Sequence, residues 1–505
     1  MLSVYFASDR SSSGKSVITI AFSKALQDIG YALNVYKTGP DFIDAFVLSK
    51  ALNLDAKNLD PFLIPDGYLA EWFFGGYEDK KPGTERGKKI HKEEAFVIES
   101  AMGLYDGNSY AIAEKFKFPV VLVMDSKRIS STMASLIYGL KKYKKGINVC
   151  GVILNNIASV RHFEIINKEI KGNISGIEVL GYVLNDKSAF SIKERHLGLT
   201  TPETDGIGIK EFNKIIRGIK EAVFKNVDLE LLIKTLEKNS IRFNRLFLDY
   251  KKKAADGKNG IRNMDAYKKS ISGYCGAISN ATKNKKVNIA VAMDKAFFFY
   301  YNFNFEILKD CGAEIIFFSP LEDKTIPKNI KAIYIGGGYP EIYAGRLSEN
   351  RTIIEEINKF SEDNGIIYAE CGGLMYLCEK LAYGGKSFDM AGIFPFEATM
   401  DGGRLSLGYR TVRFKEKTFF GEAGLTANGH EFHYSKLLDS TTNRDCGKKD
   451  CKKYKKILEY ENPNLPGEIK PEGYNILNTV GSYIHLSFFS NGELAKNFVE
   501  NAGKL

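Results

Sequence analysis

The sequence predicts an α/β protein with two domains, each a mostly parallel sheet flanked by helices. Three observations lead to this prediction. The chain has 505 residues, which is room for roughly two to four domains of ordinary size. Short apolar runs alternate with amphipathic stretches in both halves of the chain, a pattern typical of βαβ units. A segment rich in Lys, Asn, Gly and Ser, Lys251–Lys286, lies between the two series and is typical of a linker.

The first domain is expected to span residues 1–235, followed by a linker over 236–286. Its buried strands are predicted at Ser3–Ala7, Leu33–Lys37, Ala95–Ile98, Val120–Met124, Val149–Leu154 and Glu178–Tyr182. Its helices are predicted at Lys15–Asp28, Ser130–Lys142 and His162–Lys171. Ligands bind at the carboxyl ends of the strands in such sheets, so the polar loops after these strands are candidate sites.

The second domain is expected to span residues 287–505. Its strands are predicted at Val287–Val291, Ala313–Phe318, Ala332–Ile335 and Gly365–Ala369, and its helices at Phe303–Cys311 and Asn350–Asn364. We expect the lysine-rich stretch near residues 440–465 to be a surface insertion of this domain.

A loop of small polar residues, Ser8–Ser13, joins the first strand to the first helix, which Gly14-Lys15-Ser16 opens. In a phosphate-binding loop of this kind, backbone N–H groups wrap the phosphates, the lysine neutralises their charge and the hydroxyl binds Mg²⁺. Ser13, Gly14, Lys15 and Ser16 are therefore candidate ATP-binding residues. The full pattern has a glycine where Asp9 stands, so a glycine cap before a chance Gly-Lys-Ser is the alternative.

Acidic residues follow two further strands of the first domain. Lys37–Asp44 contains Asp41 and Asp44, and Glu99–Gly107 contains Glu99 and Asp106. Carboxylates at strand ends beside a phosphate loop are natural Mg²⁺ ligands. The alternative is that the three aspartates are turn and cap residues.

The second domain contains a cysteine at a predicted strand–turn–helix junction. Cys371 follows the strand Gly365–Ala369, and glycines come directly after it. A cysteine in this position is exposed to substrate, and the helix N-terminus is expected to lower the pKa of its thiol. His485 is the candidate base, and the N–H groups of Gly337 and Gly338 could form an oxyanion hole. The alternative, a buried structural cysteine, is the reading that we favour for Cys150, Cys311 and Cys378.

Composition limits the partners. The net charge of +10 is modest for this length, and the lysine clusters are more typical of solvated loops than of a nucleic-acid-binding surface. A weakly positive surface would help to collect a polyanionic small substrate. The seven cysteines have no zinc-site spacing and suit a reducing compartment. With no signal peptide and no apolar run of about 18 residues, we expect a cytoplasmic protein without a membrane partner.

Many ordered motifs resemble the cobyrinic acid a,c-diamide synthase family. The matching stretches are Lys37–Asp44, Asn58–Asp60, Met102–Gly107, Gly151–Asn155, Glu194–Leu199, Phe318–Leu321, Gly336–Glu341, Ala369–Leu377, Leu407–Tyr409, Gly429–Ser435 and Gly481–Leu486. The family joins a dethiobiotin-synthetase-like ATP-binding domain to a class I glutamine amidotransferase domain.

The resemblance implies ATP-dependent amidation of the a and c side-chain carboxylates of a corrin precursor, with glutamine as nitrogen donor and Mg²⁺ as cofactor. It implies that Lys37 is a second phosphate contact, that Ser16, Asp41 and Glu99 hold the metal, and that Asp44 and Asp106 act on the substrate or the acyl phosphate. Cys371 would attack glutamine, and His485 would move the protons.

The sequence departs from the family pattern at two informative positions. Phe42 stands where Tyr is common, which leaves the order of the two amidations open. Ser487 stands where many amidotransferases have the Glu of a catalytic triad, which indicates a Cys–His dyad or a third group from elsewhere.

Two other functions compete with this reading. One is a Ni-sirohydrochlorin a,c-diamide synthase, which has the same chemistry on a different ring. The other is a partitioning-type ATPase switch, in which Arg10 would act across a dimer; it leaves the cysteine domain unexplained. The sequence does not fix the oligomeric state, and a homodimer is one possibility.

Overall fold

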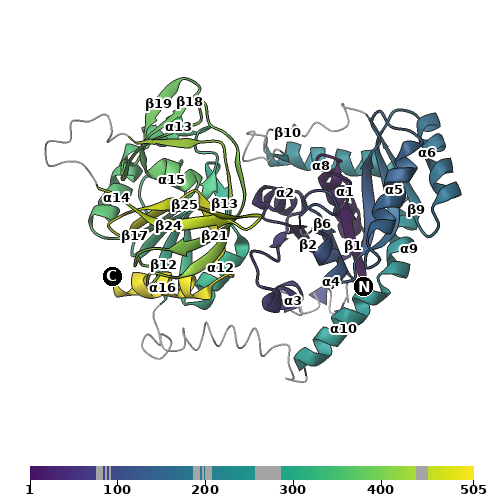
Figure 1. Ribbon diagram of the computed structural model, residues 1–505, viewed down its shortest axis with the longest axis horizontal. Coiled ribbons are helices and arrows are strands. Elements are labelled where there is room, and N and C mark those ends of the chain that lie inside the picture. Colours follow the sequence, from purple (N-terminus) through teal and green to yellow (C-terminus); the bar gives the residue numbers. More distant parts are fainter. Residues whose placement is uncertain are drawn as a thin grey trace. The chain divides into compact units, whose positions relative to one another are not determined.

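The computed structural model describes residues 1–75, 84–85, 88–89, 93–107, 109–185, 194–195, 198–199, 208–255, 286–439 and 453–505. Contacts within the chain divide it into two units, and each contains helices packed on a β-sheet (Figure 1). The first unit consists of Met1–Pro61 and Asp66–Ile261, and the second of Phe62–Pro65 and Arg262–Leu505.

The first unit is built on a parallel sheet of seven strands in the order β3-β2-β6-β1-β7-β8-β9. The strands are β1 (Leu2–Ala7), β2 (Ala32–Thr38), β3 (Lys57–Leu59), β6 (Glu94–Glu99), β7 (Pro119–Asp125), β8 (Asn148–Ile157) and β9 (Glu178–Leu184). Two short antiparallel pairs lie outside this sheet: β4 (Thr84–Glu85) with β5 (Lys88–Lys89), and β10 (Glu194–Arg195) with β11 (Gly198–Leu199). All six strands predicted for this domain are present in the sheet.

Helices cover both faces of this sheet (Figure 1). They are α1 (Lys15–Asp28), α2 (Phe42–Leu52), α3 (Asp66–Gly75), α4 (Ser109–Lys115), α5 (Thr132–Tyr143), α6 (Val160–Asn173), α8 (Ile209–Phe224), α9 (Leu229–Asn239) and α10 (Ile241–Ala255). Because strand side chains alternate between faces, Val4 and Phe6 of β1 join the core formed with α1 and α8. Tyr5 points the other way, where its ring stacks 6.2 Å from that of Phe118.

The first unit continues beyond residue 235, where we expected it to end. Residues 241–255 form α10, and its Phe243 ring lies 4.9 Å from Phe118 and 5.2 Å from Phe96. The amide of Asn244 also donates to the carbonyl of Met1 over 3.0 Å. The lysines that end this helix resemble a linker in composition, but its aromatic face is buried in the core. The rest of the expected linker, residues 256–285, lies outside the described residues.

The second unit is built on a sheet of ten strands in the order β14-β12-β15-β17-β26-β25-β24-β21-β22-β27. Its strands are β12 (Val287–Ala292), β14 (Ala313–Phe318), β15 (Ala332–Ile335), β17 (Ile366–Glu370), β21 (Ser406–Phe414), β22 (Thr426–His433), β24 (Lys455–Asn462), β25 (Leu465–Ile476), β26 (Thr479–Ser482) and β27 (Ile484–Leu486). The half from β14 to β26 is parallel, as expected. From β26 to β27 the pairing is antiparallel, an extension that was not predicted.

Smaller elements complete the second unit. The helices are α12 (Asn302–Asp310), α13 (Ala344–Glu349), α14 (Arg351–Glu362), α15 (Gly372–Leu377) and α16 (Gly492–Lys504). The strands β13 (Phe297–Phe299) and β16 (Gly337–Gly338) pair with each other, and a four-stranded sheet contains β18 (Cys378–Tyr383), β19 (Lys386–Asp389), β20 (Phe394–Thr399) and β23 (Lys436–Asp439). β17 ends where α15 begins, so the predicted strand–turn–helix junction at Cys371 is present.

The expected surface insertion near residues 440–465 is only partly tested. Residues 440–452 lie outside the described residues. Lys455–Asn462 is the strand β24, which lies between β25 and β21 in the main sheet. Its Ile457 and Leu458 are buried, so this part of the stretch is core structure and the expectation was wrong there. Because lysines surround these two apolar residues in the sequence, the strand could not be recognised there.

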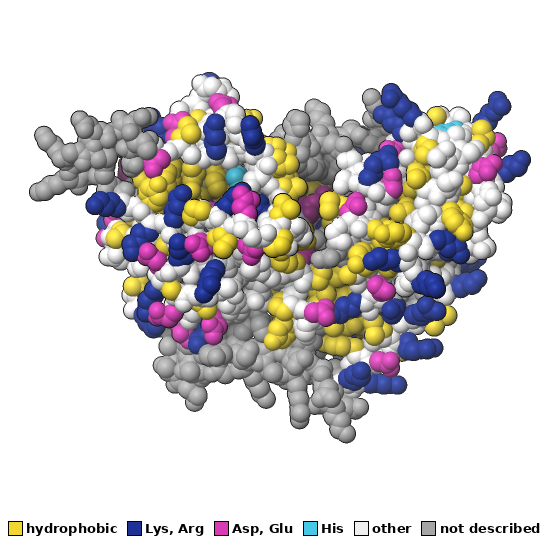
Figure 2. All heavy atoms as spheres, viewed as in Figure 1, with side chains coloured by type: hydrophobic (Ala, Val, Ile, Leu, Met, Phe, Trp, Pro, Cys, Tyr) yellow, Lys and Arg dark blue, Asp and Glu magenta, His cyan; other side chains and the backbone are white. Residues whose placement is uncertain are grey.

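The described surface is mixed in charge. Basic and acidic side chains are interspersed over the face of both units that Figure 2 shows. Among the described residues, no helix has both the length and the apolar composition that are needed to cross a membrane.

Candidate active sites

The phosphate loop has the predicted place between β1 and α1. Gly14 caps α1 with a φ of 93°, a left-handed conformation that glycine adopts at little cost. A side chain at this position would also overlap the amide of Asn155, which donates to the carbonyl of Ser13 over 2.9 Å. The Ser13 hydroxyl in turn donates to the carbonyl of Arg10 over 3.0 Å. The loop is thus held in shape from both ends, which favours the phosphate-loop interpretation over a chance sequence.

Lys15 folds back over this loop. Its Nζ donates to Oγ of Ser8 over 2.8 Å and to the carbonyl of Arg10 over 3.1 Å. Burial, and then the nearby charge of Lys37, lower the pKa of Lys15 to about 8. A buried ammonium that is surrounded mainly by neutral acceptors is suited to receive the charge of a phosphate.

Ser16, Lys37 and Glu99 form one buried network at the first turn of α1. Oε1 of Glu99 accepts from Ser16 Oγ over 2.6 Å and from Lys37 Nζ over 2.7 Å. Lys37 Nζ also lies 2.5 Å from Oδ2 of Asp44. Burial alone would lower the pKa of Lys37, but the carboxylates of Asp44 and Glu99 outweigh burial and raise it. The structure therefore brings together four of the predicted site residues.

A Mg²⁺ ion fits at Glu99. Its second oxygen, Oε2, is buried and has no hydrogen-bond partner in the described structure, beside the hydroxyl of Ser16. An orphaned carboxylate oxygen next to a hydroxyl is suited to a hard cation. No group of three or more His, Cys, Asp and Glu side chains in the described part of the chain is arranged to hold a metal. An ion here would therefore need phosphate oxygens to complete its ligands, as Mg²⁺ often does.

Asp41, which we predicted to bind metal, is the N-cap of α2. Its Oδ1 accepts from the backbone N–H groups of Ile43 and Asp44 over 3.0 and 3.1 Å. Burial, and then the charge of Asp44, raise the pKa of Asp41 to about 7. For Asp44, burial acts in the same direction, but Lys37 outweighs it and lowers the pKa. Asp41 thus has the capping role of the alternative reading, and its role as a metal ligand stays a prediction.

Asp106 lies at the exposed edge of the phosphate loop. Its Oδ2 accepts from the N–H of Gly103 over 3.1 Å. A Cβ at Gly103 would fall 2.5 Å from that oxygen and 2.5 Å from the carbonyl of Asp9 in the loop. The position suits a group that acts on the substrate beside the phosphates, although Asp106 also closes a turn, as the alternative reading has it.

Cys371 occupies a strained elbow in the second unit. Its φ of 49° and ψ of −105° are unusual for a residue with a side chain, and its N–H donates to the carbonyl of Ser482 over 2.7 Å. Such a conformation turns a nucleophile out of the strand that carries it. A Cβ at Gly372 would fall 2.9 Å from Pro340 and 3.0 Å from the backbone nitrogen of Gly338. The backbone nitrogen of Gly338, a predicted oxyanion donor, thus lies beside the turn that carries Cys371.

The expected low pKa of Cys371 is wrong. Burial raises the pKa of its thiol, and the nearby carboxylates of Glu341, Glu431 and Glu370 add to this effect. The helix that follows, α15, has only six residues and does not outweigh burial and these charges. The thiol is therefore protonated in the free protein, and it needs a base to become a nucleophile.

His485 has the place of that base. It lies in β27, and a Cβ at Gly337 would fall 3.0 Å from its Nε2. The opposite ring nitrogen, Nδ1, lies 3.5 Å from Oε2 of Glu370. The structure thus places Cys371, Gly337, Gly338 and His485 together. Glu370 was not predicted as a site residue, although its position directly before the cysteine was the available signal.

A second missed group lies on β22, in the motif Gly429–Ser435. Glu431 is buried between the guanidinium of Arg410 and the imidazole of His433, each 2.7 Å from one of its oxygens. Burial would raise the pKa of Glu431, but these two neighbours outweigh it and lower the pKa to about 2. The carbonyl of Phe432, the next residue, lies 3.8 Å from the Cys371 sulfur. The strand β22, held by the Glu431–Arg410 ion pair, therefore lies directly beside the thiol of Cys371.

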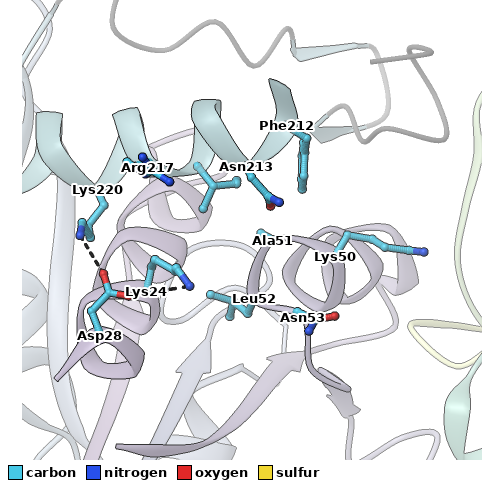
Figure 3. A pocket seen from close by; sticks show the side chains of 11 residues that line it. Lys24, Asp28, Lys50, Ala51, Leu52, Asn53, Phe212, Asn213, Arg217 and Lys220 are labelled. Carbon is cyan, nitrogen blue, oxygen red and sulfur yellow. Dashed lines mark hydrogen bonds and ion pairs between the residues drawn. The ribbon is translucent and has the colours of Figure 1, made fainter. Parts of the chain in front are cut away.

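A pocket of about 740 Å³ in the first unit lies between α1, α2 and α8, away from the phosphate loop (Figure 3). Asp28 lies among its basic residues and contacts Lys220 over 2.7 Å and Lys24 over 3.8 Å. Asp28 is the last residue of α1, about 20 Å along the helix from Lys15. Lys50 lies in the last turn of α2, where a basic side chain stabilises the helix.

A phosphate-binding domain joined to a cysteine-dependent amidotransferase domain defines the class of glutamine-dependent ligases. Residues 4–199 match the family described as the CobQ/CobB/MinD/ParA nucleotide binding domain, and residues 288–493 match the CobB/CobQ-like glutamine amidotransferase domain. This protein is an enzyme of that ligase class, and the chain belongs to the cobyrinate a,c-diamide synthase family.

Relatives with the name cobyrinate a,c-diamide synthase match both domains. The protein from Dehalococcoides mccartyi is 32% identical over 508 residues, which cover 98% of this chain and 97% of the relative. The protein from Listeria innocua is 33% identical, covering 97% of each chain. The protein from Picrophilus torridus is 33% identical, covering 99% of this chain and 98% of the relative.

Proposed function

We propose that this enzyme converts the a and c side-chain carboxylates of cobyrinic acid, an intermediate of cobalamin biosynthesis, to amides, using ATP and the amide nitrogen of glutamine. The observation that carries this proposal is the match of both domains, over almost the whole chain, to relatives named for that reaction. A partitioning-type ATPase would account for the first unit alone. The match to a glutamine amidotransferase domain and the elbow at Cys371 instead support the use of an amide donor.

The first unit activates the carboxylate. A carboxylate does not condense with ammonia in water, so transfer of the γ-phosphoryl group of ATP forms an acyl phosphate and ADP, and ammonia then displaces phosphate. Lys15 and Lys37 supply positive charge where charge moves between phosphate oxygens, and positioning does most of the catalysis. Asp44 and Asp106 are the groups that we assign to the substrate or the acyl phosphate.

Mg²⁺ would be held by Ser16 and Glu99 together with the phosphates. When bound, it neutralises phosphate charge and orients the γ-phosphoryl group. The buried, unpartnered Oε2 of Glu99 supports this assignment.

The second unit releases ammonia. His485 takes the proton of the Cys371 thiol, and the sulfur attacks the side-chain amide carbon of glutamine. The N–H groups of Gly337 and Gly338 are placed to stabilise the oxyanion that forms. The C–N bond then breaks, the proton passes from His485 to the leaving nitrogen, and ammonia departs. Water hydrolyses the thioester to glutamate and restores the thiol.

Coupled ADP formation tests this proposal. The purified chain should form ADP from ATP and Mg²⁺ only when cobyrinic acid and a nitrogen source are both present, and either glutamine or ammonium should serve. ADP formation that does not depend on cobyrinic acid would contradict the proposal. If Ni-sirohydrochlorin replaces cobyrinic acid as the required substrate, the chemistry holds and the assigned ring is wrong.

A further inference from the structure

The amidotransferase site lacks the usual acidic partner of its histidine. In this chain Ser487 stands two residues after His485, and its hydroxyl accepts from the N–H of Ser490 over 3.3 Å. We propose that Glu370, the residue directly before the nucleophile, is the positioning carboxylate that fixes the tautomer and orientation of His485. This inference rests on the proposed roles of Cys371 and His485.

Glu370 is a buried carboxylate, and both of its oxygens accept hydrogen bonds. It is only 1% exposed and ends β17. Its Oε1 accepts from the Tyr368 hydroxyl over 2.6 Å and from the Leu486 N–H over 3.0 Å. Its Oε2 accepts from the Tyr334 hydroxyl over 2.8 Å. These three donors satisfy the buried oxygens and fix the carboxylate in one orientation.

The imidazole of His485 lies between this carboxylate and Gly337 of β16. Nδ1 lies 3.5 Å from Oε2 of Glu370, an oxygen whose position Tyr334 already fixes. A Cβ at Gly337 would fall 2.5 Å from Cε1 and 3.0 Å from Nε2, so this side of the ring faces Gly337, the neighbour of the Gly338 nitrogen beside the elbow. A proton on Nδ1 directed at Glu370 leaves Nε2 without a proton, which is the form that can accept one from a thiol.

Other buried carboxylates near this site are engaged elsewhere. Glu431 binds Arg410 and His433. Glu472 accepts from the hydroxyl of Ser482 and the N–H of Tyr483. Glu370, in contrast, lies within ion-pair distance of His485, with Oε2 3.5 Å from Nδ1.

The chain positions of Glu370 and Cys371 suit two different roles. The elbow turns the Cys371 side chain away from the strand, while Glu370 keeps the strand direction and points at the tyrosines. The negative charge of Glu370 helps to keep the thiol protonated, and it stabilises the imidazolium once His485 has taken that proton. Glu370 itself gains and loses no proton in the cycle.

The test measures glutamine hydrolysis by the full chain carrying Glu370→Gln. This variant keeps the shape of the side chain and removes its charge. We expect kcat to fall by about 100-fold or more, as carboxylates that orient a catalytic histidine require. KM for glutamine should stay within about threefold, and amidation with ammonium should be unchanged. Glu370→Asp, which keeps the charge, should recover part of kcat.

Glu472→Gln is the matched control because it removes another buried carboxylate from the same sheet. It should leave kcat for glutamine hydrolysis within about threefold. An equal loss in both variants would show a general effect on the sheet and would overturn the inference. A folded Glu370→Gln protein with unchanged kcat would overturn it too. If Cys371→Ser still hydrolyses glutamine, the proposed site itself is wrong, which is a distinct outcome.

A second measurement needs no variant of Glu370 that might fail to fold. Nitrogen-15 spectra of the histidine-labelled chain, with His485 assigned by its loss in His485→Gln, report which ring nitrogen carries the proton. The inference predicts the Nδ1–H tautomer in the free enzyme at neutral pH. The Nε2–H tautomer would overturn it.

Discussion

The hydroxyl of Ser16 donates to Oε1 of Glu99 over 2.6 Å and so joins the first turn of α1 to the end of β6. Lys37 donates to the same oxygen over 2.7 Å. The second oxygen of Glu99 is buried and has no hydrogen-bond partner in the described structure. One oxygen thus fixes the carboxylate, and the other is the oxygen that we propose binds Mg²⁺.

Glu99→Gln should therefore weaken Mg²⁺ binding. We expect the Mg²⁺ concentration for half-maximal amidation to rise by about tenfold or more, since an amide oxygen carries no charge. Titration of Mg²⁺ at saturating ATP with ammonium as nitrogen source measures this change without the amidotransferase site. Glu94→Gln, at the opposite end of the same strand, is the control and should have no effect. An unchanged Mg²⁺ requirement would remove Glu99 from the metal site.

The affinity for ATP should fall as the pH rises through about 8. Burial and Lys37 lower the pKa of Lys15 to about 8 in the free enzyme, so its ammonium loses its proton above that pH. KM for ATP measured from pH 7 to 9.5 should rise, because a neutral Lys15 attracts phosphate less. In Lys15→Arg the guanidinium stays charged, and the rise should disappear even if KM is higher throughout. A flat profile in the parent enzyme would contradict this role of Lys15.

Asp41→Asn should stabilise the protein more at pH 8 than at pH 5. The pKa of Asp41 is raised from 3.8 to about 7 in the folded protein. Between these values the folded state binds the proton more tightly than the unfolded state, so stability falls as the pH rises. Asparagine also caps helices well, and it does not titrate. The difference in unfolding temperature between variant and parent, followed by calorimetry, should grow from pH 5 to pH 8.

Asp44→Asn is the contrasting variant. Lys37 holds the pKa of Asp44 below its usual value, so Asp44 contributes stability above about pH 4 and loses it only in acid. The unfolding temperature of this variant should be lower than that of the parent at both pH 5 and pH 8. If the two aspartate variants show the same trend, the assignment of opposite pKa shifts is wrong.

Local patterns predicted the strands and helices that carry the sites. Lys15–Asp28 was predicted with the bounds that the structure gives, because its helical spacing and the preceding Gly14 agree. The strand β24 and the helix α10 were missed because lysines surround their buried faces, and only tertiary packing shows which face is inside.

The role of Glu370 could not be predicted for a related reason. Its contact with His485 joins β17 to β27, strands more than a hundred positions apart in the chain, through a pairing register that the sequence does not specify. The pKa of Cys371 was predicted in the wrong direction, because the helix N-terminus is visible in the sequence and the depth of burial is not.

Cys371→Ser should separate the two activities. We expect glutamine-dependent amidation to disappear, because serine is a much weaker nucleophile and the site only supplies ammonia. Amidation with added ammonium should continue at close to the parent rate. Both rates are measured as diamide formed per minute with a common cobyrinic acid stock. If a folded variant loses both activities, Cys371 has a role beyond the release of ammonia.

The central claim is the identity of the acceptor, and mass analysis of a substrate panel tests it most directly. Cobyrinic acid, hydrogenobyrinic acid and Ni-sirohydrochlorin are each incubated with the parent enzyme, ATP, Mg²⁺ and glutamine labelled with nitrogen-15 in its side-chain amide. We predict that cobyrinic acid gains two labelled amides in place of two carboxylates. Labelled diamide from Ni-sirohydrochlorin and none from cobyrinic acid would contradict the account.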